Sequence, residues 1–186
     1  MLLVKTLSEC YNNFMKKLFI RENFFSDVEK IRNISLSSRF YSPNEIESRV
    51  NWRGYRTKEL SNFKNELLNR SKNYILDEIV KIFNLKDISI ETFFHLTFSD
   101  TKNTLNNFDK NKWHRDSNYS YAGIVYITPN APRNSGTSII LDGKQIDVQT
   151  RYNKMVAYPS HLTHAPTDLF GDTIQNGRIT LTFFCS

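Results

Sequence analysis

The sequence changes character near Ile88, and this change limits the possible fold more than any other feature. In residues 57–84 apolar side chains recur three or four positions apart, which predicts one long helix beginning near Thr57. After Ile88 the chain is rich in β-branched and aromatic residues separated by turn residues. This pattern predicts six strands, at 88–98, 121–128, 137–141, 145–150, 153–158 and 177–184. Helices followed by short strands are typical of a mainly β protein with N-terminal helices (α+β), built on an antiparallel barrel or sandwich.

Turn residues support this order of elements. Asp142-Gly143 lies between two predicted strands and is a signal for a tight hairpin. Gly136 is expected to form a turn of its own. Residues 36–56 show no regular period and are expected to be irregular.

The chain is long enough for one domain with a sizeable core, having 186 residues and no internal repeat. Residues 1–35 contain short helical patterns, and Ser26-Asp27 is expected to cap one of these helices. We therefore expect a single domain over 1–186, with a helical front (1–86) and a β core (87–186).

Charge and cysteine content favour an ordinary protein of a reducing compartment. The net charge is +6 and the isoelectric point about 9.3, but basic residues are interleaved with acids, which favours a mixed solvated surface. Cys10 and Cys185 lack the spacing of a zinc site and do not suggest a disulfide scaffold. No apolar run is long enough for a membrane span, and the first residues lack a secretory signal. A cytoplasmic location without a membrane partner is expected.

A candidate metal site is formed by His114 and Asp116, with His164 further along the chain. In an extended segment, residues two apart point to the same side, so one segment can supply two ligands. Two nitrogens and one carboxylate on one side of iron(II) leave the other positions open for a cosubstrate and dioxygen. Arg178 can bind a distant carboxylate of that cosubstrate with its two-pronged guanidinium. A His-x-Asp tripeptide alone is common, and its ordinary interpretation is a surface loop.

Two other histidines compete for roles at this site. His161 lies three residues before His164 and is expected at the rim of the pocket or beside the ligands. His95 alternates with apolar residues in a predicted strand. It is expected to be a packed strand residue that can also line the pocket.

Several motifs occur in the order found in one known family. They are His114-x-Asp116, Tyr126-Ile127-Thr128, Ser135-Gly136-Thr137, Tyr158-Pro159-Ser160-x-Leu162-x-His164 and Arg178-Ile179-Thr180, preceded by Trp52-Arg53-Gly54-Tyr55-Arg56. Together they resemble the iron(II)- and 2-oxoglutarate-dependent oxygenases, in particular the prolyl-hydroxylase-like branch and its small bacterial and phage-encoded members. The resemblance covers most of the chain and implies a double-stranded β-helix core of the jelly-roll or cupin-like type. It also implies a bacterium or a phage-infected cell as the setting.

The resemblance assigns a role to each candidate residue. The metal ligands would be His114, Asp116 and His164, the last one selected over His161 by the Ser-x-Leu-x-His pattern. The distal carboxylate of 2-oxoglutarate would pair with Arg178, and Thr180 and Tyr126 would add hydrogen bonds. No further catalytic acid or base is implied.

The implied reaction uses iron(II), 2-oxoglutarate and dioxygen to hydroxylate an unactivated C–H bond, with release of succinate and carbon dioxide. The substrate would be a peptidyl residue, an amino acid or another small molecule. The carboxylate of Asp116 occupies the position that halogenating relatives leave empty for chloride. Phe184 stands where nucleic-acid demethylases carry a second arginine, which argues against a nucleic-acid base as substrate.

Two alternatives keep part of this pattern. A cupin-like barrel that binds a metal or ligand without turnover would retain the fold and the histidines. A basic nucleic-acid-binding module would need a basic-aromatic stripe, which the sequence lacks. The loops at 99–112, 129–136 and 165–176 are the expected rim of the substrate site, and the oligomeric state stays open.

Overall fold

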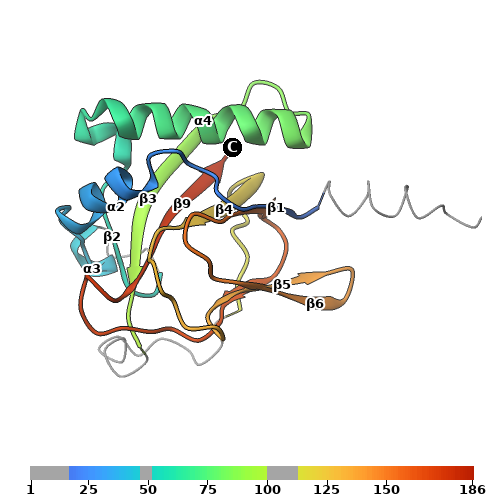
Figure 1. Cartoon of the computed structure of the whole chain (residues 1–186). Helices are drawn as coiled ribbons and strands as arrows, with labels where there is room; N and C mark the ends of the chain where they lie inside the picture. The colour runs from blue at the N-terminus through green and yellow to red at the C-terminus, as the bar shows by residue number, and fades with distance from the viewer. Residues whose placement is uncertain (1–16, 47–51, 100–112) are drawn as a thin grey trace, which may run out of the picture.

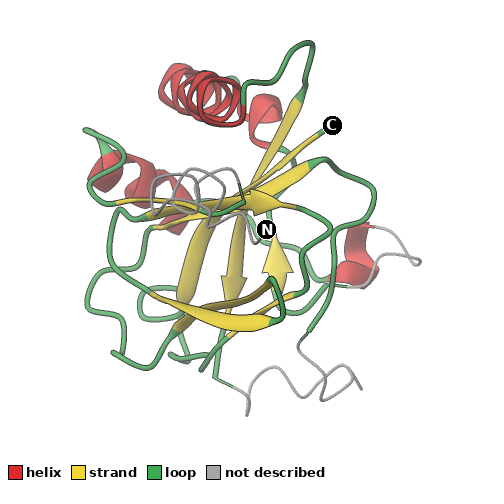
Figure 2. Cartoon of the chain, turned by 90° about the vertical axis from the view of Figure 1, so that its right-hand side faces the viewer, coloured by secondary structure: helices red, strands yellow, loops and turns green. Residues whose placement is uncertain are grey.

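Two antiparallel sheets form the centre of the protein in a computed structural model, which describes residues 17–46, 52–99 and 113–186 (Figures 1 and 2). The larger sheet has the order β1-β7-β4-β9-β3-β2, and the smaller sheet has the order β6-β5-β8. The strands are β1 (Phe19–Arg21), β2 (Tyr55–Arg56), β3 (Ile90–Thr97), β4 (Tyr121–Tyr126), β5 (Gly136–Leu141), β6 (Lys144–Gln149), β7 (Met155–Pro159), β8 (His164–Pro166) and β9 (Arg178–Cys185). Every paired strand runs antiparallel to its neighbour.

The helical elements are α2 (Val28–Leu36), α3 (Pro43–Ile46), the 3-10 helix η1 (Leu60–Phe63) and α4 (Glu66–Phe83). The two longest, α2 and α4, cover the outer face of the larger sheet. In Figure 1, α4 runs across the top of the molecule, above β3 and β9. Its buried residues Ile75 and Ile79 share one hydrophobic core with Ile31 of α2 and with Phe94 and Leu181 of the sheet. Burial of this apolar surface is the main force that holds the helices on the sheet.

The inner face of the larger sheet is opposite the smaller sheet. A second hydrophobic core fills part of the space between them and includes Tyr126, Ile139, Val148 and Tyr158. The remainder of the inner face carries both polar and aromatic side chains and forms the pocket described below. The fold therefore separates an apolar face, which supports the helices, from a face that carries chemistry.

The predicted hairpin at Asp142-Gly143 is confirmed. Leu141 pairs with Lys144, so the loop between β5 and β6 has two residues. Both have positive φ, 49° and 76°, which is the turn geometry that matches the twist of paired strands.

The long helix predicted at 57–84 is correct only from Glu66 onward. Lys64 adopts a left-handed conformation with φ of 49°, which ends η1, and the Asn65 side chain then accepts a hydrogen bond from the Leu68 amide and caps α4. Thr57 is wrong as the helix start, because it pairs with β3: its amide donates to Phe94 O, and its hydroxyl accepts from the Phe94 amide.

Three short strands were not predicted, namely β1, β2 and β8. Two of them lie within 1–86, so this region is not purely helical. Gly136 begins β5 and does not form a turn; a Cβ there would lie 2.2 Å from Val148 O, so the close approach of β6 requires glycine. Asp27 precedes α2 as expected but makes no capping hydrogen bond, because its carboxylate binds Lys30 and Ser26.

Two further expectations concern residues outside the described part. Most of the polar loop at 99–112 and Cys10 fall there. Cys185 is buried at the end of β9. Among the described residues, none of the helices is both long enough and apolar enough to cross a lipid bilayer.

Candidate metal centre

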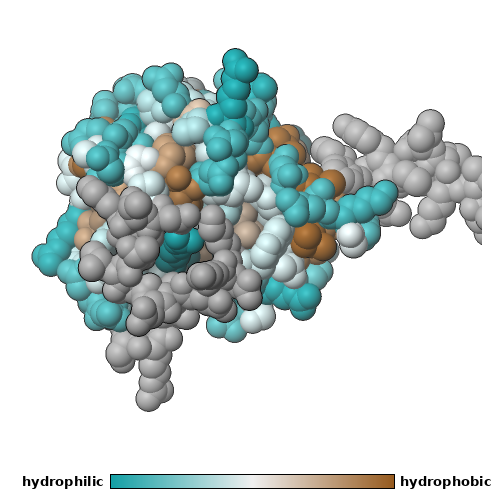
Figure 3. All heavy atoms as spheres, turned by 90° about the horizontal axis from the view of Figure 1, so that it is seen from below, coloured by the Kyte–Doolittle hydropathy of each residue, from teal (hydrophilic) through white to brown (hydrophobic). Residues whose placement is uncertain are grey.

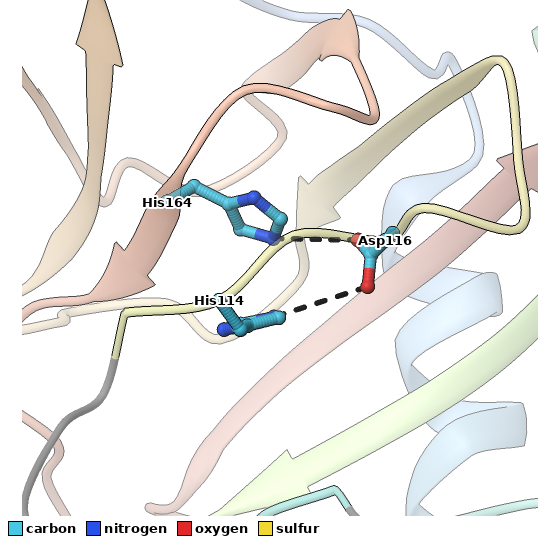
Figure 4. A group of neighbouring side chains, drawn as sticks. All are labelled: His114, Asp116 and His164. Atoms are coloured by element: carbon cyan, nitrogen blue, oxygen red, sulfur yellow. Dashed lines mark ion pairs between the residues drawn. The ribbon is translucent and has the colours of Figure 1, made fainter.

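His114, Asp116 and His164 come together at one end of the pocket between the sheets (Figure 4). One potential ligand atom from each residue lies within 4.8 Å of the others. Nε2 of His164 is 3.3 Å from Asp116 Oδ2, and Nε2 of His114 is 3.9 Å from Asp116 Oδ1. The sequence spacing thus corresponds to a real cluster in space, with two residues preceding β4 and one at the start of β8.

Backbone hydrogen bonds fix the two segments relative to each other. The amides of His114 and His164 each donate to the other's carbonyl oxygen at 2.9 Å. The Asp116 amide donates to Ser160 O at 3.0 Å. The segment that carries His114 therefore extends the smaller sheet beyond β8, and these backbone hydrogen bonds place the three side chains next to one another.

The ring of His164 is oriented by a neighbouring carbonyl group. Its Nδ1 lies 2.9 Å from Leu162 O, so Nδ1 carries the proton and donates it there. Nε2 faces Asp116 and, once it gives up its proton, is the nitrogen that can bind a metal. His164 is buried against Tyr158, with 4.8 Å between ring centroids, whereas the His114 side chain is 52% exposed.

Asp116 is held in its ionised form. Burial raises the pKa of its carboxyl group, but the hydrogen bond from His164 and the positive charges of His164, His114 and Arg56 outweigh this, so the pKa lies below its usual value. An ionised oxygen ligand beside two imidazole nitrogens is the donor set that suits iron(II) and similar divalent metals. The residues present therefore fit such a metal.

A pocket of about 1130 Å³ extends from this cluster between the two sheets. Its walls come from the inner face of the larger sheet, from β5 and β8, and from the segment that carries His114. Figure 3 shows a hollow on this side of the molecule with hydrophilic atoms visible inside it. The volume is sufficient for a cosubstrate together with a small substrate.

Arg178 lies deep in the pocket at the start of β9. It is 5% exposed, its Nη2 donates a weak hydrogen bond of 3.4 Å to Thr137 Oγ1, and its guanidinium lies 5.5 Å from the ring centroid of Tyr126. Burial lowers the pKa of Arg178, while Tyr126 opposes this change. Its buried Nε has no hydrogen-bond acceptor among the described residues, and none of their carboxylates forms an ion pair with it. A buried cation in this condition is suited to a carboxylate supplied by a ligand.

The other two residues expected at the cosubstrate also line or border this region. The Tyr126 hydroxyl lies 2.8 Å from Thr137 Oγ1, and Thr137 also accepts from Arg178. Thr180 lies two residues after Arg178 on the same face of β9 and exchanges a hydrogen bond of 3.0 Å with Thr182. Tyr126 therefore contacts Arg178 with its aromatic ring, and its hydroxyl group bonds the same Thr137 hydroxyl that accepts from Arg178.

The two remaining histidines occupy different positions. His161 is exposed and does not line the pocket. His95 lines it from β3, and its Nε2 lies 2.5 Å from Arg53 O. Burial, reinforced by the positive charge of Arg56, lowers the pKa of His95 well below its usual value, so the ring is neutral near pH 7.

Two residues of the pocket could not be assigned from the sequence, namely Thr137, which is a partner of Arg178, and Arg56, which is a second cation. Thr137 belongs to the motif Ser135-Gly136-Thr137, but the motif gives it no role. Arg56 was part of the Trp52–Arg56 motif, but only its pairing with β3 turns it toward the pocket.

Several solved structures share this fold, whereas the sequence matches no protein-family model and no curated protein. A prolyl-4-hydroxylase of Pseudomonas putida aligns over 90% of this chain and 91% of its own, with a TM-score of 0.62 and 16% identity. HygX of Streptomyces hygroscopicus, solved with nickel and 2-oxoglutarate, aligns over 98% and 87%, with a TM-score of 0.64 and 12% identity. An oxidoreductase of the 2OG-Fe(II) oxygenase family from Burkholderia pseudomallei aligns over 100% and 93%, with a TM-score of 0.64 and 12% identity.

These similarities confirm the predicted fold class, a mainly β protein with N-terminal helices that matches the double-stranded β-helix of the 2-oxoglutarate oxygenases. The chain also carries the His-x-Asp and distant His cluster at one pocket. At 12–16% identity the likeness concerns the fold, and the activity has to be argued from the site.

Proposed function

We propose that this protein is an iron(II)- and 2-oxoglutarate-dependent dioxygenase that hydroxylates a C–H bond of a small or peptidyl substrate. The observation that carries the proposal is the coexistence, in one pocket, of a two-histidine, one-carboxylate cluster and a buried arginine without a carboxylate partner among the described residues. The first part suits the metal and the second part suits the distal carboxylate of the cosubstrate. A metal-binding barrel without turnover has no need for the arginine.

The metal would be held by His114, Asp116 and His164. Each is prepared for this task by the chain itself: Leu162 O selects the tautomer of His164, and the lowered pKa keeps Asp116 ionised. The reciprocal hydrogen bonds between the His114 and His164 backbones limit rearrangement when the metal binds. When bound, iron(II) and 2-oxoglutarate supply the oxidation of a C–H bond by dioxygen, with succinate and carbon dioxide as co-products.

The distal carboxylate of 2-oxoglutarate would be bound by Arg178. Thr137 and the ring of Tyr126 position the guanidinium, and Thr180 offers a hydroxyl on the same strand face. Because the surrounding side chains exclude water, an ion pair here is stronger than one on the surface.

As the substrate class we propose a peptidyl residue, an amino acid or another small molecule. The enzyme from Pseudomonas putida is a prolyl-4-hydroxylase, which supports a peptidyl or free amino-acid residue as one candidate. No acid or base beyond the metal centre is required of the chain. Its part is to bind, to orient and to exclude water.

The proposal is tested by titrating metal-free protein with iron(II) and 2-oxoglutarate under anaerobic conditions and recording the visible absorption of their chelate. We expect a band that requires both components and disappears in His114→Ala, whose side chain is half exposed and whose loss leaves the core intact. His161→Ala is the matched control, because this histidine is exposed and lies outside the pocket, and it should retain the band. A folded wild-type protein without the band, or an unchanged band in His114→Ala, would overturn the proposal.

A further inference from the structure

Arg56 is a second cation in the pocket, half-buried as a residue but with a buried Nε, on the side opposite β5. It belongs to β2 at the edge of the larger sheet, where it pairs with His95. Its guanidinium lies among aromatic rings, 4.8 Å from the centroid of Trp52, 5.3 Å from Phe184 and 5.9 Å from Phe93. Apolar walls and one charged group are the composition of a recognition site for a charged group of a ligand.

Within residues 17–46, 52–99 and 113–186, this cluster has hydrogen-bond donors without acceptors. Among the described residues, the Arg56 side chain has no hydrogen-bond or ion-pair partner, and its Nε is fully buried. The indole Nε1 of Trp52, against which Arg56 packs, is a second buried donor without an acceptor in the described part. Each unsatisfied buried donor destabilises the fold, so two adjacent ones point to an acceptor that arrives with a ligand.

Buried cations with a structural role look different in this chain. Arg32 donates to Ile127 O and to Gln175 O, both at 2.8 Å. Lys154 donates to Gln149 O at 2.8 Å and lies 3.2 Å from the carboxylate of Glu22. Where a cation serves only the fold, the chain supplies its acceptors, whereas the described residues supply none to Arg56.

Arg56 and Arg178 lie at different ends of the pocket. Arg178 begins β9, and Phe184, which contacts Arg56, lies six residues further along the same strand, a distance of about 20 Å along the backbone. A single 2-oxoglutarate that chelates the metal and reaches Arg178 leaves Arg56 without a partner. The electrostatic interaction between Arg56 and Asp116 indicates that Arg56 faces the metal end of the pocket.

We propose that Arg56 and Trp52 form an anion subsite that binds a carboxylate, phosphate or sulfate group of the prime substrate. This inference rests on the proposed function and narrows it: the oxidised molecule carries an oxyanion, and the group that is oxidised lies between this anion and the metal. The planar fork of Arg56 accepts two oxygens of such a group, and the indole of Trp52 donates to one of them. The aromatic walls exclude water and strengthen the pairing.

The test is titration calorimetry on protein loaded with nickel(II) and saturated with 2-oxoglutarate, so that Arg178 is already engaged. The probes are matched pairs that differ in the anion: L-proline and L-prolinamide, L-leucine and L-leucinamide, and O-phosphoserine and serine. Inorganic phosphate and sulfate are added as free anions. In at least one pair we expect the anionic member to bind at least about tenfold more tightly, as a charge-assisted hydrogen bond to a buried group provides.

Three variants test whether this preference for the anionic probe depends on Arg56 and Trp52. Arg56→Gln should reduce it to less than about twofold, and Arg56→Lys should retain part of it, because the charge persists without the fork. Trp52→Phe keeps the ring and removes only the donor, so it should lower the preference by a few-fold. Arg70→Gln is the control for net charge, since this side chain is 69% exposed on α4, and it should behave as wild type.

The outcomes separate the two proposals. If 2-oxoglutarate does not bind to the nickel-loaded wild type, the proposed function is wrong. If 2-oxoglutarate binds but no probe shows an anion preference, or the preference survives in Arg56→Gln, the anion subsite is wrong and the dioxygenase proposal is unaffected.

Discussion

The two faces of strand β9 are equally buried and differ completely in chemistry. All eight residues from Arg178 to Cys185 are buried. The outer face presents Ile179, Leu181, Phe183 and Cys185 to the helices, and the inner face presents Arg178, Thr180, Thr182 and Phe184 to the pocket. Burial alone therefore does not distinguish a structural residue from a functional one in this strand.

The difference lies in how each face contributes to the free energy of unfolding. Each large apolar side chain of the outer face stabilises the fold by about 1.5–3 kcal/mol through burial. The inner face contributes in the opposite direction at Arg178, because a desolvated guanidinium with an unpaired Nε is unfavourable. A buried residue that destabilises the fold is best explained by a ligand.

The largest effect on stability is expected on the outer face. Leu181→Ala should lower the free energy of unfolding by 2–5 kcal/mol, because the lost contacts and the resulting cavity lie in the centre of the helix–sheet core. Urea unfolding at constant pH measures this change. Leu76→Ala in α4 is the matched control, since Leu76 is only partly buried against the same core and should lose less.

Weaker 2-oxoglutarate binding by folded Leu181→Ala protein would contradict the assignment of a purely structural role to the outer face of β9. We expect the affinity of the folded fraction to be the same as that of wild type, because Leu181 does not line the pocket.

A smaller effect is expected on the inner face, at His95 of β3. Its pKa in the folded protein lies well below the usual 6.5, mainly because of burial, so the unfolded chain takes up the proton first as the pH falls. Stability is complete above pH 6.5 and decreases below it, by up to about 1.4 kcal/mol per pH unit until the folded pKa is reached. Unfolding measured at pH 7.5, 6.5 and 5.5 should show a shallower decrease in His95→Gln than in wild type. An equal decrease of the free energy of unfolding with falling pH in both proteins would mean that His95 is not held neutral.

Much of the fold could be predicted from periodicity. The six predicted strands correspond to β3, β4, β5, β6, β7 and β9, because each has at least five residues of β-type sequence. The missed strands β1, β2 and β8 have two or three residues, too few to show alternation. The wrong helix start at Thr57 arose because the apolar spacing continues across Lys64, where the backbone is left-handed.

The candidate site was predictable where the residues are close in sequence or belong to a motif. His114 and Asp116 are two residues apart, and His164 follows a recognisable segment. Arg56 and Thr137 could not be assigned in this way, because their roles depend on contacts across strands. Arg56 reaches the pocket through the pairing of β2 with β3, and Thr137 reaches Arg178 from the opposite sheet.

The central claim is that the outer face of β9 serves the fold, whereas Arg178 on its inner face serves a ligand. Its most direct test is calorimetric binding of 2-oxoglutarate to nickel-loaded protein, comparing wild type with Arg178→Met. Methionine fills much of the same space without the charge, so the free energy of unfolding should stay the same or rise. We predict that 2-oxoglutarate binds at least about 30-fold more weakly to this variant, while nickel binding is retained. Unchanged affinity for 2-oxoglutarate, or a strong loss of stability, would show that Arg178 serves the fold and would contradict the account.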